Sequence, residues 1–329
     1  MNSYYVDPGY DIQQGEKKAI RKTVNLIACA FLAMSFIMVL WSYPAIFLAK
    51  RIGLYEVLVQ TANDPALLNV LQVTISALAF LVPYALFGKI LKVNFGEALN
   101  LKVETNFKQT VGLLLLGAGF CAFANFASAV AGTIFESFGF TYTANIHRPN
   151  PSDPFGIALS ILATAVTPAI VEEFALRGVV LHALKRFGNG FAVLISATLF
   201  GLLHGNFEQI PFAFLVGLYL GFLTIKTKSI VPAVILHFYN NFSSVIISLV
   251  DDKFSQNIMQ FAHMFYLLIM ICLSVVGLFV LREEDNNFFA TGDEKTVLPV
   301  KTKVLTALFS PVMLVVYLIV VWEIFFIYV

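Results

Sequence analysis

The sequence predicts an all-α membrane protein, a polytopic bundle of about nine transmembrane helices, and three observations support this fold class. Of the 329 residues, 59% are hydrophobic and 12% are charged, against about 25% charged residues in an ordinary soluble domain. The mean hydropathy is +0.82, and 33 residues are Phe. The apolar residues form continuous runs, not the alternating pattern of a membrane β-barrel. Together with a formal net charge of +1, these properties exclude a soluble globular enzyme, a disordered chain and a nucleic-acid-binding protein.

The transmembrane helices are predicted from the apolar runs. A span needs about 20 apolar residues to cross about 30 Å of hydrocarbon. Runs of this kind lie at 25–49, 67–88, 110–135, 155–181, 190–207, 210–225, 230–250, 258–281 and 304–328. The sixth run, at 210–225, is the shortest.

The lysine and arginine residues predict a cytoplasmic N-terminus. With this orientation the inside segments carry seventeen of these residues and the outside segments carry four, in agreement with the positive-inside rule. The inside residues are Lys17, Lys18, Arg21, Lys22, Lys89, Lys92, Lys102, Lys108, Arg177, Lys185, Arg186, Lys226, Lys228, Arg282, Lys295, Lys301 and Lys303. The outside residues are Lys50, Arg51, Arg148 and Lys253. The C-terminus is then outside.

Polar segments divide the chain into four predicted regions. These are a cytoplasmic polar tail at 1–24, N-terminal transmembrane helices and loops at 25–154, a helical core at 155–250, and C-terminal transmembrane helices at 251–329 with a polar linker at 282–303. Two outside segments are also predicted, a short interfacial helix at 50–66 and a turn-rich loop at 136–154.

The fourth span carries charges that are expensive inside a membrane, namely Glu172, Glu173 and Arg177. Glu173 and Arg177 are four residues apart, so they are predicted to pair on one helix face. Glu172 is about 100° further round the helix and has no local cation, which favours it as a general base. The alternative is that the cluster lies at a solvated, cytoplasmic helix end.

Spans five and seven add further polar side chains. His204 ends an apolar run between Gly201 and Gly205, and His237 and Asn241 share one face of the seventh span. Two donors on one face can bind an oxyanion. Taken singly, His204 reads as a packing residue and the pair as an interhelical hydrogen-bond clamp. His147, His182, His263 and Glu323 are expected to be interfacial or solvated.

In order and spacing, these residues resemble a known family. Glu172-Glu173-x-x-x-Arg177, Phe200-x-x-x-His204 and His237-x-x-x-Asn241 are similar to the motifs of the CPBP family. This family includes the type II CAAX prenyl endopeptidases and the bacteriocin-processing or immunity (Abi) membrane proteins. The similarity covers about residues 155–250, the helical core.

The resemblance implies an intramembrane endopeptidase. By similarity, Glu172 and His204 activate a water, His237 and Asn241 stabilise the oxyanion, and Glu173 and Arg177 hold the geometry. No cofactor is required in this interpretation. The alternative is a metalloprotease in which Glu172, His204 and His237 ligate one zinc ion, although the chain has no His-Glu-x-x-His helix.

The predicted spans place these residues at different depths in the membrane. Glu172 falls near the middle of the membrane, whereas His204 falls towards the outer end of span five. A shared site requires that span five starts deeper or that its outer loop dips into the bundle. Pro168 and Pro232 precede Glu172 and His237 and can kink their helices.

The predicted partners are membrane lipid and a hydrophobic or lipidated peptide, with no nucleic acid. The substrate class is either a prenylated CAAX-type C-terminus or a leader or bacteriocin-type peptide, and a prokaryotic plasma membrane is the expected location. The alternatives are a non-enzymatic immunity or peptide-binding protein and a transporter. A transporter would more often show inverted repeats, and the sequence has none.

Overall fold

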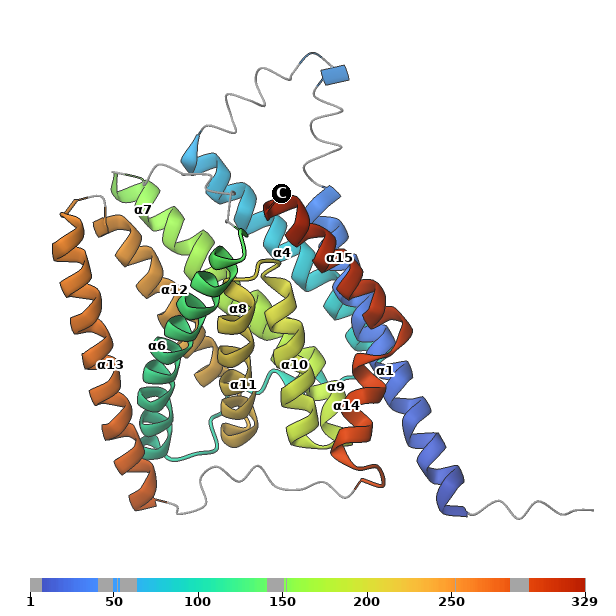
Figure 1. Ribbon diagram of the computed structural model, residues 1–329. Coiled ribbons are helices and arrows are strands. Elements are labelled where there is room, and N and C mark those ends of the chain that lie inside the picture. The colour runs from blue at the N-terminus through green and yellow to red at the C-terminus, as the bar shows by residue number, and fades with distance from the viewer. Residues whose placement is uncertain are drawn as a thin grey trace, which may run out of the picture.

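A computed structural model shows the helical bundle that the sequence predicts (Figure 1). It describes residues 8–40, 50–51, 53, 64–140, 151, 153–251, 253–284 and 296–328, and this part of the chain contains no strand. The helices in chain order are α1 (Pro8–Leu40), α4 (Pro65–Ile90), α5 (Phe95–Ala98), α6 (Phe107–Ser137), α7 (Pro154–Ile161), η1 (Leu162–Val166), α8 (Thr167–Glu173), η2 (Phe174–Leu181), α9 (His182–Leu184), η3 (Lys185–Phe187), α10 (Asn189–Leu203), α11 (Gln209–Thr227), α12 (Val231–Asp251), α13 (Gln256–Glu284), α14 (Val300–Leu308) and α15 (Pro311–Tyr328). The elements from α7 to η3 follow one another without a break, with π-helical turns at η1 and η2.

The number of possible spans is smaller than nine. Within the described ranges, seven helical segments are long and apolar enough to cross a membrane, or eight if α14 and α15, which meet at a 60° bend, form one span. The difference is α10, which has 15 residues. At 1.5 Å per residue it is about 22 Å long, shorter than the about 30 Å of hydrocarbon. One of the predicted spans is therefore a short helix inside the bundle.

Two spans begin at an Asp-Pro pair. Asp64 accepts hydrogen bonds from the backbone N–H groups of Ala66 and Leu67 at the start of α4. Asp153 accepts one from Gly156 at the start of α7. A proline in the first turn removes a donor that would have no helical partner, so these pairs define where the chain enters the bundle.

Two sequence expectations meet a different outcome, and others fall largely outside the described residues. The predicted polar tail is already helical from Pro8, as the first part of α1. Pro232 lies in the first turn of α12, where no carbonyl is freed, so the predicted kink before His237 is wrong. Much of the predicted interfacial helix, outer loop and linker falls at residues 54–63, 141–150 and 285–295, outside the described residues.

The two ends of the bundle differ in charge. We call one the lysine-rich end, because fifteen of the seventeen residues predicted inside gather there; Arg177 is buried within η2, and Lys295 is not described. It holds the start of α1 and the connections between α4 and α6, η3 and α10, and α11 and α12 (Figure 1, bottom). We call the opposite end the lysine-poor end, where Lys50, Arg51 and Lys253 are the described cations.

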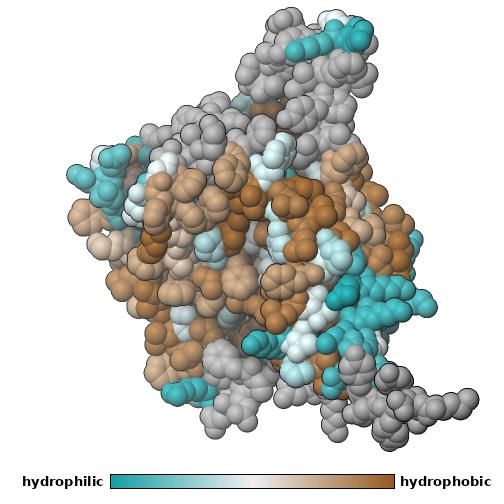
Figure 2. Space-filling model, turned by 45° about the vertical axis from the view of Figure 1, so that its right-hand side comes forward, coloured by the Kyte–Doolittle hydropathy of each residue, from teal (hydrophilic) through white to brown (hydrophobic). Residues whose placement is uncertain are grey.

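The surface between these ends is apolar. Figure 2 shows hydrophobic residues over the middle of the visible face, with hydrophilic residues gathered below it. On α13 the exposed side chains include Phe261, Phe265, Leu268 and Phe279. An exposed patch of this kind is unfavourable in water but suits contact with lipid tails. The fold is thus that of an integral membrane protein.

Glycines allow α6 and α13 to pack closely. A Cβ atom added at Gly277 would lie 2.6 Å from the carbonyl oxygen of Gly112 and 2.8 Å from the backbone nitrogen of Leu116. Small residues at helix contacts let backbones approach in this way. Gly277→Ala must therefore push α13 away from α6, and we expect it to cost about 1–3 kcal/mol of stability, as overpacking does.

Thermal unfolding in detergent measures this loss. Gly15→Ala is the matched control, because nothing lies within 4 Å of its added Cβ atom. A Gly277→Ala protein as stable as Gly15→Ala would contradict the close α6–α13 contact.

Candidate active site

The carboxylates of the fourth span lie on α8, between the π-helical turns η1 and η2. Glu173 and Arg177 are fully buried, with 0% and 1% of their surface exposed. Arg177 Nη1 donates to Glu173 Oε1 at 2.7 Å, and Arg177 Nη2 donates to the carbonyl of Gly217 on α11 at 3.1 Å. The predicted i, i+4 pair is confirmed. It lies in the interior, so the alternative of a solvated helix end is wrong for these two residues.

His237 connects this pair to Glu172. It lies on α12 and is 4% exposed. Its Nδ1 lies 2.9 Å from Glu173 Oε1, the same oxygen that binds Arg177. Its Nε2 lies 3.9 Å from Glu172 Oε2. The Nδ1–H group donates to the Glu173 carboxylate, so the other ring nitrogen faces Glu172.

Phe200 on α10 packs against three residues of the site: Arg177 on η2, His204 at the end of α10 and His237 on α12. Arg177 Cζ stands 4.7 Å from its ring centre. Its ring meets those of His204 and His237 edge to face, at centroid distances of 5.2 Å and 5.5 Å. Cation–π and edge-to-face contacts favour these orientations. The sequence identified Phe200 only as part of the Phe200-x-x-x-His204 motif and assigned it no role.

His204 follows the last residue of α10. Its Nδ1–H donates to the carbonyl of Phe200 at 2.9 Å, which leaves Nε2 as the ring nitrogen without that bond. The turn after it is held by Asn206, which is 6% exposed. Asn206 Nδ2 donates to the His204 carbonyl at 3.2 Å, and its Oδ1 accepts from the backbone N–H of Gln209 at 2.7 Å. Asn206 is a positioning residue that sequence reasoning missed.

This turn explains how His204 and Glu172 reach the same depth. The short α10 starts near the lysine-rich end and stops at Leu203, and the buried turn then leads into α11. Gly205 in the turn has φ +59°, a left-handed conformation that glycine adopts without strain. Of the two alternatives raised by the sequence, the structure supports a connection that dips into the bundle.

Asn241 lies one helical turn after His237 on α12 and is half-buried. Its Oδ1 accepts a hydrogen bond from Asn240 Nδ2 at 3.3 Å. The Nδ2 group of Asn241 then keeps its two hydrogens for other acceptors. The side-chain contact that the structure gives Asn241 is thus with its neighbour on α12, and its role at the site stays a prediction from the sequence.

A cavity of about 890 Å³ adjoins Glu172 and His204. Its walls come from α1, α4, α8 and the two ends of the α10–α11 turn. The lining residues are Met38, Leu68, Leu71, Gln72, Ile75, Ser76, Phe80, Pro168, Glu172, Leu203, His204 and Gln209. The Glu172 side chain is 17% exposed, so the base candidate reaches this cavity. The contribution of α4 was missed, because Gln72 and Ser76 lie in an apolar run far from every motif.

The zinc alternative concerns Glu172, His204 and His237. Both imidazoles use Nδ1 for a hydrogen bond to oxygen, as metal-ligating histidines commonly do. As the side chains lie in the described part of the chain, no group of three His, Cys, Asp or Glu residues is arranged to hold a metal ion. Zinc ligation by these three residues stays a prediction from the sequence.

The other histidines and the last acidic residue named from the sequence have different positions. His182 is near the lysine-rich end, 4.0 Å from Glu97, and His263 is exposed on α13. His147 lies outside the described residues. Glu323 on α15 is partly buried, and its Oε2 would lie 3.5 Å from a Cβ atom on Gly205. It therefore packs against the turn that carries His204.

Comparison with known proteins agrees with this location of the site. Residues 154–243 match the family described as type II CAAX prenyl endopeptidase Rce1-like. The matched segment runs from the start of α7 into α12, and it contains all seven motif residues. Neither curated proteins nor solved structures gave a match.

Proposed function

The chain carries an Rce1-like domain of the CPBP/CAAX family, and from this premise we propose that it is an intramembrane endopeptidase that cleaves a membrane-associated peptide with a Glu172-activated water. The family supports a CAAX-type membrane protease in general. The roles of the single residues and the glutamate-type mechanism are our proposal.

One observation carries it: Glu172 lies close to His237 and lines the same cavity as His204. Glu172 Oε2 and His237 Nε2 are 3.9 Å apart, too far for a direct hydrogen bond. A water between them can bond to both groups. His204 lines the same cavity as Glu172, and its Nε2 is suited to accept the second hydrogen of that water.

Hydrolysis then proceeds in two steps. Glu172 takes a proton from the water, whose oxygen attacks the peptide carbonyl carbon and forms a tetrahedral oxyanion. Doubly protonated His237 donates from Nε2, and Asn241 donates from Nδ2, to this oxyanion. Glu172 then passes its proton to the amide nitrogen, the carbonyl re-forms as the C–N bond breaks, and a carboxylic acid and an amine leave.

Glu173 and Arg177 support this chemistry without touching the substrate. A positive charge on His237 is offset by Glu173, which binds its Nδ1–H. Arg177 holds Glu173 in turn. His237 is thus a donor whose orientation is set by the buried Glu173–Arg177 pair.

The substrate contacts fit a hydrophobic peptide. Most of the cavity wall is apolar, from residues such as Leu68, Leu71 and Phe80. Gln72, Ser76 and Gln209 add polar groups, which suit the N–H and C=O groups of an extended peptide. We propose a hydrophobic or lipidated peptide, either CAAX-type or leader-type.

Comparative peptidomics of membranes tests the proposal. Membranes with wild-type protein should contain cleaved peptides that are lost with Glu172→Gln and kept with Glu283→Gln, which removes an exposed carboxylate of α13. Identical peptide profiles for wild type and Glu172→Gln would instead favour a non-enzymatic immunity or peptide-binding protein.

A further inference from the structure

The cavity beside Glu172 opens from the half of the bundle next to the lysine-poor end. Met38 is near the end of α1, and the lining residues of α4 all lie within its first five turns. His204 and Gln209 flank the α10–α11 turn, which faces the same end. Glu172 lines this cavity from near the middle of its helical segment.

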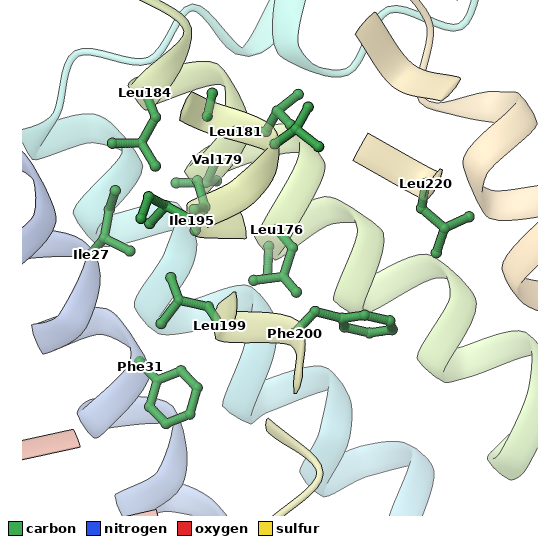
Figure 3. Close-up of a cluster of buried hydrophobic side chains, with 14 of the residues drawn as sticks. Ile27, Phe31, Leu176, Val179, Leu181, Leu184, Ile195, Leu199, Phe200 and Leu220 are labelled. Atoms are coloured by element: carbon green, nitrogen blue, oxygen red, sulfur yellow. The ribbon is translucent and has the colours of Figure 1, made fainter. Parts of the chain in front are cut away.

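A tightly packed layer separates the cavity from the lysine-rich end. Its members are at most 2% exposed and come from η2, α9, α10, α11 and α1 (Figure 3). They are Ile27, Phe31, Leu176, Val179, Leu181, Leu184, Ile195, Leu199, Phe200 and Leu220. Protein interiors of this density leave few voids larger than a water molecule, so this layer offers no path for a peptide.

A second cavity at the lysine-rich end does not bypass the layer. It has a volume of about 390 Å³ and is lined by Glu97, His182, Lys185 and Lys228, among others. It reaches Arg177 but none of Glu172, His204 or His237. Arg177, where this cavity meets the interior, is bound to Glu173 and to the carbonyl of Gly217.

The charges identify which compartment each end faces. Among the described residues outside the membrane interior, fifteen Lys and Arg residues lie at the lysine-rich end and three at the lysine-poor end. Short basic connections are retained on the cytoplasmic side of a membrane. The lysine-poor end therefore faces away from the cytoplasm, and so does the catalytic cavity.

We propose that the cavity receives its substrate from the non-cytoplasmic side of the membrane. The substrate class is then a hydrophobic peptide exposed on that side, such as a segment of a translocated or membrane-inserted precursor, not the C-terminus of a cytoplasmic protein. The statement that a peptide substrate enters here rests on the proposed peptidase function. The side from which the cavity is reached rests on geometry and charge alone.

Side-specific cysteine labelling tests the direction of access. In a background with Cys29, Cys121 and Cys272 replaced by alanine, single cysteines are introduced by Ser76→Cys in the cavity, Lys253→Cys at the lysine-poor end and Lys102→Cys at the lysine-rich end. A membrane-impermeant maleimide is applied to intact cells and to inverted membrane vesicles. We expect Ser76→Cys and Lys253→Cys to react in intact cells, and Lys102→Cys to react in inverted vesicles.

Two results would overturn the proposal. One is labelling of Ser76→Cys only from the side that labels Lys102→Cys, or from neither side. The other is labelling of Lys102→Cys, but not Lys253→Cys, in intact cells. The same labelling in a Glu172→Gln background separates this inference from the proposed function, because access does not depend on catalysis. Loss of the peptidase hypothesis would leave the labelling pattern intact, and a reversed pattern would leave the peptidomics result intact.

Discussion

Glu172→Gln is expected to lower the rate of peptide cleavage by about 10²–10⁴-fold, the usual contribution of a general base, while the protein stays folded. Glutamine keeps the size of the side chain but cannot take a proton from water. His204→Ala should cause a comparable loss, because both groups adjoin the same cavity and are proposed to hold one water. The double variant should then be no slower than the slower single variant, since residues that act as a unit give non-additive losses.

Quantitative mass spectrometry of a peptide found by the membrane comparison gives these rates. Glu283→Gln serves as the control carboxylate, and an unchanged unfolding temperature shows that each variant is folded. Losses that simply multiply in the double variant would contradict a shared water. Activity that disappears with a chelator and returns with zinc would contradict the glutamate-type mechanism, whichever variants are active.

Arg177→Met is expected to destabilise the protein by about 3–5 kcal/mol, the cost of leaving one partner of a buried ion pair alone. Glu173 would keep its bond to His237 but lose the cation at 2.7 Å. It already has one oxygen, Oε2, without a hydrogen bond, so the site has little capacity to compensate. The stacking of the guanidinium on Phe200 would be lost as well. Thermal unfolding in detergent measures the change.

Two further variants sharpen this result. Glu173→Gln combined with Arg177→Met removes both charges of this pair and should recover part of the lost stability, because neither Glu173 nor Arg177 is then left as an unpaired charge. The recovery is not complete, since His237 loses the carboxylate at its Nδ1. Lys228→Met breaks an equally short pair, 2.7 Å from Glu104, at a position where both side chains are largely exposed. That change should cost less than about 1 kcal/mol. Equal destabilisation by Arg177→Met and Lys228→Met would refute the argument from burial.

The local parts of this site could be predicted from the sequence. Glu173 and Arg177 are one helical turn apart, so their pairing follows from helix geometry. The run of apolar residues around them also predicts that the pair is buried within a bundle. The same reasoning holds for the order of the helices and for the Asp-Pro starts of α4 and α7.

The non-local parts could not be predicted, because they depend on how helices of different length meet. The depth of His204 is set by the early end of α10 and by the turn that Gly205 and Asn206 form. The cavity wall on α4 depends on the packing of α4 against α8, which no local signal in residues 65–90 reveals. The direction of access could not be predicted either, because it depends on where the cavity lies relative to the basic connections between helices.

The π-helical turn η1 has a consequence for the length of this segment. A π turn holds one residue more than an α turn, so it acts as a single inserted residue that the helix absorbs without breaking. Each residue in a helix advances the direction of the side chain by about 100°. One residue gained or lost at 162–166 would therefore turn Glu172 and Glu173 away from His237, even if every side chain of the site were retained. In evolutionary terms, the number of residues between Asp153 and Glu172 is itself part of the active site.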